Sequence, residues 1–294
     1  MDTIINKERE AGRTSASAEL KTALMNALRG DVPADNRILA DLARRTDNEA
    51  DLSGVAKHNV IGSILEGLGL KLKYIRPSAE QVVGTIVKLT EFGLSGVDLR
   101  NVLNEYPNIL AVGASGLEAR AKWWGGKDVF IELVKRHPPI ASYSPGNLED
   151  TRRAIMVDKD MFVALACKSP VFVGYSAEGN IIPRLRYAKS LGMKILSIED
   201  HLKVLKGSKS EFIKNLHGIG AENSKYEEFR NNVIESLQDA RKAYIESLGG
   251  DPADPAYAAL IKKNAPRFID GLAKKGLPAD LEEFLNFREN AIAN

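Results

Sequence analysis

The hydrophobic residues between Phe92 and Gly192 follow a pattern that occurs three times, each time anchored on a proline. The prolines are Pro107, Pro138 and Pro170, so the copies lie 31 or 32 residues apart. Large apolar side chains stand eight and five residues before each proline and two residues after it: Leu99, Val102 and Ile109; Phe130, Leu133 and Ile140; Phe162, Leu165 and Phe172. A period of this length is typical of stacked supersecondary units, so it predicts a helical-repeat protein.

Each copy is predicted to contain a helix, a tight turn and a second helix. Apolar residues three and four apart before the proline indicate an amphipathic helix, which ends there because proline has no N–H and clashes with the preceding turn. A serine then precedes the second apolar run: Ser115 begins a capping-box sequence, Ser144 stands before a proline, and Ser176 takes the same place in the third copy. One such unit cannot bury its apolar face alone, so we expect neighbours to stack into a solenoid.

Helical patterns also flank the three copies. Leucines at positions 20, 24 and 28 predict a helix capped by Ser17, and the run from Ser53 to Leu70 predicts another. Ser78 begins a capping-box sequence before a further apolar run, which indicates a degenerate fourth repeat. After the copies, apolar spacings over 226–248 predict one long helix, and shorter helical patterns follow up to residue 290.

The chain is therefore predicted to be all-α, because no segment shows the alternation of a strand. We expect residues 1–16 to be disordered and residues 17–220 to form a helical-repeat solenoid with N-terminal cap helices. Residues 221–294 are predicted to form a C-terminal helical extension, whose function the pattern does not indicate.

Parts of the repeated region resemble the mitochondrial transcription termination factor (mTERF) family. The similarity lies in the prolines with apolar neighbours, in the runs Phe92–Leu99 and Tyr175–Gly192, and in the segment Ser197–Leu202. It covers about residues 60 to 216. The resemblance implies a curved all-helical solenoid whose basic concave face holds double-stranded DNA, or in some members RNA or an RNA-modifying partner. Ala141 departs from the pattern, since a large residue is usual at that place.

Charge is distributed unevenly along the chain. Residues 1–70 carry a net charge of −2, residues 71–220 carry +7 and residues 221–294 carry −3, so the positive excess lies on the repeats. A solenoid can gather such charge onto one face, where it attracts phosphates. The alternative is an evenly solvated surface.

Basic residues recur at equivalent places in the second helix of each copy. Arg120, Arg152 and Arg184 are spaced 32 residues apart, and Lys122, Arg153 and Arg186 accompany them. In a solenoid, equal spacing predicts a line of cations, which suits the tracking of a phosphate backbone. We predict that these six residues bind nucleic acid, with arginines that merely cover a neighbouring helix as the alternative.

The remaining polar residues give no constellation for catalysis. The four histidines have no second ligand-type residue at metal spacing, so neither a metal nor another cofactor is predicted, and the protein is not expected to be an enzyme. The pairs Glu149-Asp150 and Glu199-Asp200 stand in predicted first helical turns, where the helix dipole accounts for them. The single cysteine, Cys167, excludes a disulfide within the chain and favours a reducing compartment.

The sequence therefore favours a protein that binds double-stranded DNA or RNA through its repeats and has no membrane segment. The C-terminal helices are an additional surface for a protein partner. The alternative is a protein-binding helical-repeat scaffold or a secreted bacterial effector with no role at nucleic acid. The N-terminus has three acidic residues among its first ten and no apolar run. We thus expect a bacterial cytoplasmic location, or an organellar one after removal of a targeting segment.

Overall fold

The computed structural model describes residues 15–29, 36–53, 56–70 and 77–293, and every regular element within these ranges is a helix. None of the described helices has the length and apolar character that crossing a bilayer requires. The all-α prediction is confirmed for these residues. The chain divides into two compact units, residues 1–142 and residues 143–294. Of the segment expected to be disordered, residues 1–14 lie outside the described ranges.

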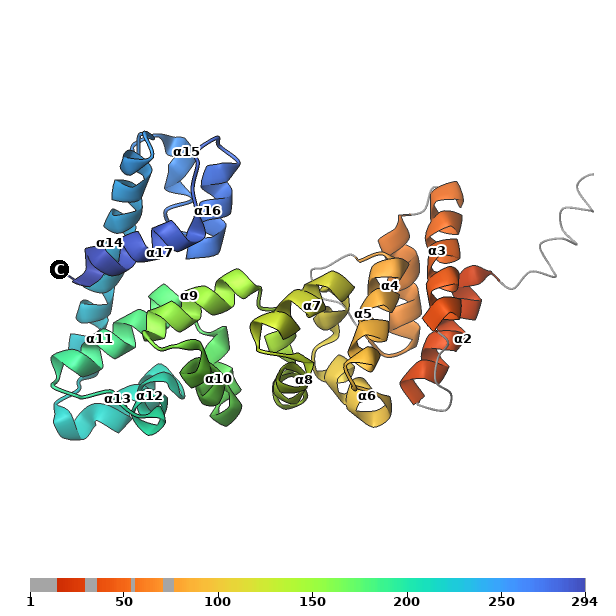
Figure 1. The fold of residues 1–294 in the computed structure, drawn as a ribbon, viewed down its shortest axis with the longest axis horizontal. Coiled ribbons are helices and arrows are strands. Elements are labelled where there is room, and N and C mark those ends of the chain that lie inside the picture. The colour runs from red at the N-terminus through yellow and green to blue at the C-terminus, as the bar shows by residue number, and fades with distance from the viewer. Residues whose placement is uncertain (1–14, 30–35, 54–55, 71–76, 294) are drawn as a thin grey trace, which may run out of the picture. The chain divides into compact units, whose positions relative to one another are not determined.

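Unit 1 contains seven described α-helices and two 3₁₀ turns (Figure 1). They are α2 (Ala16–Arg29), α3 (Asn36–Ser53), α4 (Lys57–Gly67), α5 (Ala79–Glu91), α6 (Gly96–Glu105), η1 (Pro107–Ala111), α7 (Ala114–Trp123), α8 (Lys127–Arg136) and η2 (Pro138–Ser142). Asp47 on α3 accepts hydrogen bonds from the N–H groups of Ala79 and Glu80 at 3.0 and 3.1 Å. This carboxylate therefore satisfies two otherwise unpaired donors at the start of α5 and fixes α5 against α3.

Unit 2 begins with the second helix of the second copy and runs to the C-terminus. Its elements are α9 (Pro145–Ile155), α10 (Lys159–Lys168), η3 (Pro170–Gly174), the π-helical turn η4 (Ala177–Ile181), α11 (Ile182–Ser190), α12 (Ile198–Leu205), α13 (Lys209–Leu216), η5 (His217–Ile219), α14 (Asn223–Ser247), α15 (Pro255–Ala258), α16 (Ala265–Ala273) and α17 (Leu281–Ala293). The long helix predicted over 226–248 is thus present as α14.

The three proline-anchored copies have the predicted local structure. In each, the first α-helix ends two residues before the proline, and the proline opens a five-residue 3₁₀ turn. Ile109, Ile140 and Phe172 have exposed fractions of 0%, 0% and 1%, which confirms that these side chains fill the space beneath the turns. The second helices begin close to the predicted places.

Two of the three serine caps predicted within the proline-anchored copies are confirmed. Ser144 and Ser176 accept hydrogen bonds from backbone N–H groups three residues ahead at 3.2 and 3.0 Å. The Ser115 cap is wrong, because α7 already begins at Ala114. Gly113 precedes α7 with a φ of +78°, a left-handed conformation that glycine adopts without strain, and so the helix starts two residues earlier than the capping box predicts.

Two N-terminal boundaries also differ from prediction. Helix α2 begins at Ala16, so Ser17 lies inside it and does not cap it. The run from Ser53 to Leu70 is not one helix, because Ser53 is the last residue of α3 and α4 extends only over Lys57–Gly67. The apolar spacing in the sequence did not indicate that α3 ends at Ser53 and that α4 begins only at Lys57.

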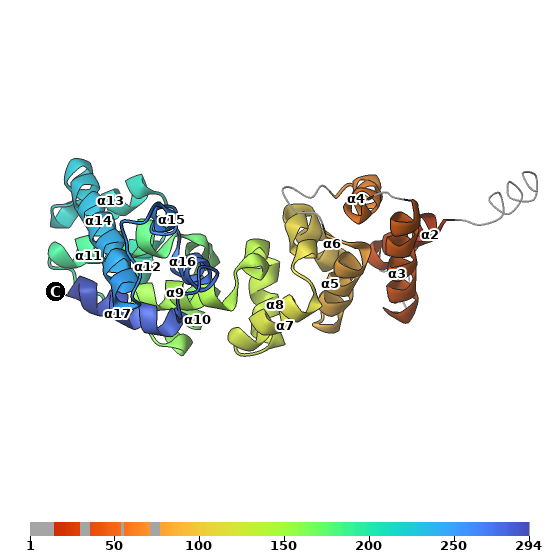
Figure 2. The same cartoon turned by 90° about the horizontal axis from the view of Figure 1, so that it is seen from above.

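The C-terminal helices pack onto the second helices of the second and third copies. Helix α14 contacts α11, and α16 and α17 both contact α9 (Figures 1 and 2). Tyr244, Phe268 and Phe284 form the aromatic centre of this block, with the Phe268 and Phe284 rings 5.0 Å apart. The sequence placed a boundary near residue 220, whereas the structure puts residues 221–294 in the same unit as the third copy.

Candidate nucleic-acid interface

Arg120 and Arg184 use their guanidinium groups inside the fold. Arg120 donates to the carbonyl oxygens of Gly116 and Ser142 at 2.7 and 3.3 Å, and burial lowers its pKa. Arg184 is only 4% exposed and donates to the carbonyls of Leu205 and Gly207 at 3.3 and 3.0 Å. Both arginines therefore hold a turn that follows about 22 residues later in the chain, each within its own unit.

Arg152, the third member of the row, is bound mainly to its own helix. Its Nε and Nη2 donate to the Glu149 carboxylate at 3.0 and 2.6 Å, and its Nη1 donates to the Val157 carbonyl at 2.5 Å. The hydrogen bonds that Arg152 donates to Glu149 raise the pKa of Arg152 and lower the pKa of Glu149. A phosphate at Arg152 has to compete with this two-point contact.

The accompanying residues are placed differently. Lys122 is exposed on α7 in unit 1. Arg153 and Arg186 lie in unit 2, where they line one hollow of about 320 Å³ together with Lys189. The structure thus brings two of the six predicted residues to one site and adds a lysine that the sequence analysis did not select.

The hollow lies among α9, α11 and α17. Helix α11 supplies Arg186 and Lys189, which are three residues apart and therefore on one side of the helix. Helix α9 supplies Arg153, and α17 supplies Arg288 and Glu289. The apolar part of the lining consists of Ala154, Met156, Ile182 and Leu185.

The cationic side chains of the hollow differ in the number of hydrogen bonds and ion pairs that they already make within the protein. Arg186 has no side-chain hydrogen bond or ion pair with another residue in the part of the chain that the structure describes. Lys189 approaches only the Met156 sulfur, at 3.7 Å. Arg153, in contrast, donates to Asn286 Oδ1 at 2.9 Å and lies 3.5 Å from a Glu149 oxygen. Two cations are therefore available to an anion without loss of an internal carboxylate contact.

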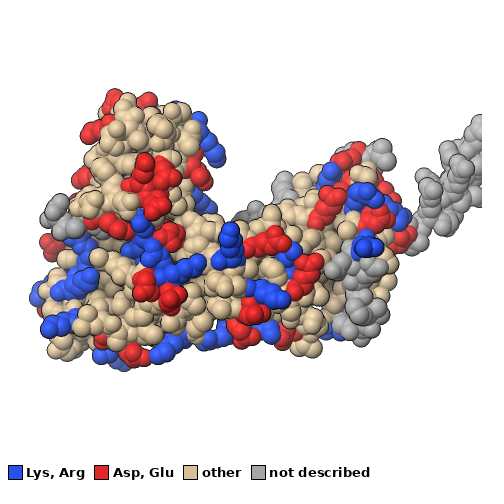
Figure 3. All heavy atoms as spheres, in the orientation of Figure 1, with Lys and Arg blue, Asp and Glu red and all other residues tan. Residues whose placement is uncertain are grey.

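Basic and acidic side chains alternate on the face of unit 2 seen in Figure 3, with basic atoms gathered over α9 and α11. On this face the basic residues therefore form a local group, and the hollow adds three cations, Arg153, Arg186 and Lys189, that lie close together. A local site of this kind binds one or two phosphate groups at short range.

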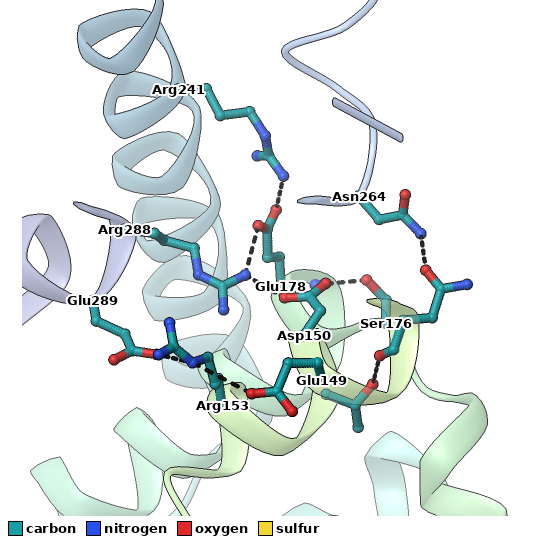
Figure 4. Close-up of polar contacts among 12 residues, drawn as sticks. Glu149, Asp150, Arg153, Ser176, Glu178, Arg241, Asn264, Arg288 and Glu289 are labelled. Atoms are coloured by element: carbon teal, nitrogen blue, oxygen red, sulfur yellow. Dashed lines mark hydrogen bonds and ion pairs between the residues drawn. The ribbon is translucent and has the colours of Figure 1, made fainter. Parts of the chain in front are cut away.

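A buried charge network lies beside the hollow. Arg288 donates to Asp150 Oδ1 at 2.5 Å and to Glu178 Oε1 at 3.1 Å, and Arg241 pairs with the other oxygen of Glu178 (Figure 4). The two arginines and Asp150 are each at most 5% exposed. Two positive and two negative groups balance one another, as burial of charge requires.

Asp150 corrects one sequence interpretation. The sequence assigned it to a first helical turn stabilised by the helix dipole, but its carboxylate is buried against Arg288 on α17. Burial, with a contribution from the nearby Glu178 carboxylate, raises the pKa of Asp150. Asp200, by comparison, does cap its helix, since it shares a capping box with Ser197.

Two features of the site escaped sequence reasoning. Lys189 follows Arg186 by three residues, and that spacing was a signal available in the sequence. The contribution of α17 had no such signal, because Glu289 and Arg288 are separated from α9 by more than a hundred residues.

Over the described ranges, no three histidine, cysteine, aspartate or glutamate side chains gather closely enough to hold a metal ion. Comparisons of the chain with models of known protein families, with curated proteins and with solved structures find no match.

Proposed function

We propose that this protein binds nucleic acid, with the hollow of unit 2 as a phosphate-binding site on a helical-repeat solenoid. The observation that carries the proposal is the meeting of Arg153, Arg186 and Lys189 at one hollow, where Arg186 and Lys189 have no carboxylate partner among the described residues. The resemblance of the third copy to the mTERF family supports the same class of ligand.

The chemistry of these side chains suits phosphate oxygens. A guanidinium donates two parallel hydrogen bonds to a phosphate, and a lysine ammonium supplies a further charge-assisted donor. Each phosphate that a protein neutralises releases counterions, so affinity falls as salt rises, by a slope of about 0.7 to 0.9 per phosphate in a double logarithmic plot. Arg186 and Lys189 share one phosphate at the hollow, so together they contribute a slope of about 0.7 to 0.9.

The distinguishing measurement is the salt dependence of binding to mixed-sequence DNA and RNA, single-stranded and duplex. The test variant is R186Q/K189Q. The matched control is K206Q/K214Q, which removes the same charge from two exposed lysines of unit 2 that do not line the hollow. We expect the slope to fall by about 0.7 to 0.9 in the test variant and by less than half as much in the control.

Equal changes in the two variants contradict a defined site and indicate general charge attraction. Absence of salt-dependent binding to every nucleic acid refutes the proposal and favours the protein-binding scaffold.

A further inference from the structure

Glu289 is an unexpected residue for an anion site. It is the single carboxylate among the described residues that line the hollow, and its side chain is 41% exposed. Its one ionic contact is with Arg153 Nε, at 3.9 Å, the outer limit of an ion pair. A carboxylate has about four acceptor positions, so Glu289 keeps most of its hydrogen-bonding capacity for a ligand.

A carboxylate beside a phosphate weakens binding unless the ligand also brings a hydrogen-bond donor to it. Nucleic acids carry such donors on the amino groups of bases and on the ribose 2′-hydroxyl. Among the described residues, the other side chains of the lining are cationic or apolar, and none carries a second carboxylate, amide or hydroxyl acceptor to read a base edge. The 2′-hydroxyl stands on the carbon next to the one that carries the 3′-phosphate, so every ribonucleotide presents it close to a bound phosphate.

Glu289 is also held in a fixed position. The neighbouring Arg288 is anchored by Asp150 and Glu178 (Figure 4). Asn286, one turn earlier on α17, accepts a hydrogen bond from Arg153. The turn of α17 that leads into Glu289 is thus held against α9 at two points. A preorganised acceptor discriminates between ligands better than one on a free chain end.

We propose that the hollow selects RNA over DNA: Arg186 and Lys189 hold a phosphate, and Glu289 accepts a hydrogen bond from the adjacent 2′-hydroxyl. This inference rests on the proposed function and names its ligand. The apolar lining of Ile182, Leu185 and Met156 then contacts the sugar and base without reading the sequence.

The test compares three single-stranded oligonucleotides of one sequence made only of adenine and cytosine, so that the bases are identical. They are RNA, DNA and 2′-fluoro RNA, which keeps the ribose pucker but lacks the donor. A hydrogen bond to a charged group corresponds to a preference of about tenfold. We expect the full-length protein to bind RNA about tenfold more tightly than either of the other two.

Two substitutions separate the acceptor from its charge. E289A removes both, and we expect it to bring the RNA preference to within twofold of unity while raising the affinity for DNA. E289Q removes the charge but keeps one acceptor oxygen, so it should retain an intermediate preference. The control is E283A, an exposed glutamate of the same helix that does not line the hollow, which should leave the preference unchanged.

Three results overturn the inference. Equal binding of RNA and 2′-fluoro RNA by the wild type shows that no donor is recognised. A full preference that persists in E289A shows that the acceptor lies elsewhere. Loss of the preference in E283A as well shows a general charge effect. In each case the R186Q/K189Q salt slope still decides the proposed function separately, because it depends on phosphate contacts alone.

Discussion

Replacing Arg288 with methionine tests whether the buried network fastens the C-terminal helices to α9. The Arg288 side chain is 1% exposed, and methionine fills much of its volume without the charge. The Asp150 carboxylate, itself 5% exposed, then stays buried with its nearest cation removed. Breaking a buried ion pair on one side costs about 3 to 5 kcal/mol. This is a large share of the roughly 5 to 15 kcal/mol that stabilises a typical domain.

The cost of R288M should depend on pH with a defined sign. Burial already raises the pKa of Asp150, and loss of Arg288 removes an interaction that opposes this rise. The folded variant therefore holds a proton on Asp150 more tightly than the unfolded chain, in which the pKa is about 3.9. Its free energy of unfolding falls as pH increases from that value through the raised pKa. The difference in the free energy of unfolding between the wild type and R288M should therefore be larger at pH 7 than at pH 4.5.

The assay is urea unfolding followed by far-ultraviolet circular dichroism at both pH values. Both tryptophans, Trp123 and Trp124, lie in unit 1, so their fluorescence reports on that unit alone and serves as an internal reference. R267M, at an exposed arginine of α16, is the matched control and should change stability by less than about 0.5 kcal/mol. A cost of R288M below about 1 kcal/mol at pH 7, or a gap that widens toward acid, refutes the reasoning.

Two further substitutions test the packing and the role of the buried arginines. F172A removes a ring that is 1% exposed and whose centroid lies 5.6 Å from that of Phe162. Urea unfolding should show that F172A lowers the free energy of unfolding by about 3 to 5 kcal/mol. The control V171A, at the exposed neighbouring residue, should lower it by less than about 0.5 kcal/mol. R184Q should lower the free energy of unfolding by about 1.5 to 3 kcal/mol and leave the salt slope of binding unchanged. R186Q should leave the free energy of unfolding nearly unchanged and lower the salt slope of binding. Similar effects of R184Q and R186Q on both quantities would contradict the separate roles assigned to these arginines.

The local structure of the three copies followed from the sequence because its causes are local. A proline ends a helix wherever it stands, and an apolar residue two positions later has to be buried beneath the turn that results. Phe172 and its counterparts Ile109 and Ile140 confirm this. The Ser115 cap failed at the same scale, since the freedom of Gly113 to adopt a positive φ let α7 start earlier.

The arginine row shows that equal spacing does not determine which arginine side chains face solvent. A guanidinium can donate to a backbone carbonyl as well as to a phosphate. Arg120 and Arg184 recur at one spacing, and each has a turn carbonyl within reach about 22 residues ahead. Spacing predicts that such residues have equivalent surroundings, but only the packing of later segments determines whether a carbonyl or solvent faces the side chain.

The buried network was outside the reach of sequence reasoning for a related cause. Asp150 and Arg288 are 138 residues apart, and nothing near either residue indicates the other. A carboxylate in a first helical turn is ordinarily a surface residue that interacts with the helix dipole. Burial by α17 changes the role of Asp150, and burial is a property of the assembled fold.

These contacts give the C-terminal helices a physical role at the proposed site. They carry a net charge of −3, which opposes the positive excess of the repeats and weakens attraction to phosphate at long range. At short range, α17 supplies Glu289, a carboxylate that the described residues lining the hollow from α9 and α11 do not offer. A site with fewer free cations depends less on charge alone and more on hydrogen bonds that distinguish one ligand from another. Under the proposed function, the packing of α17 on α9 therefore favours selection among nucleic acids over maximal affinity for all of them.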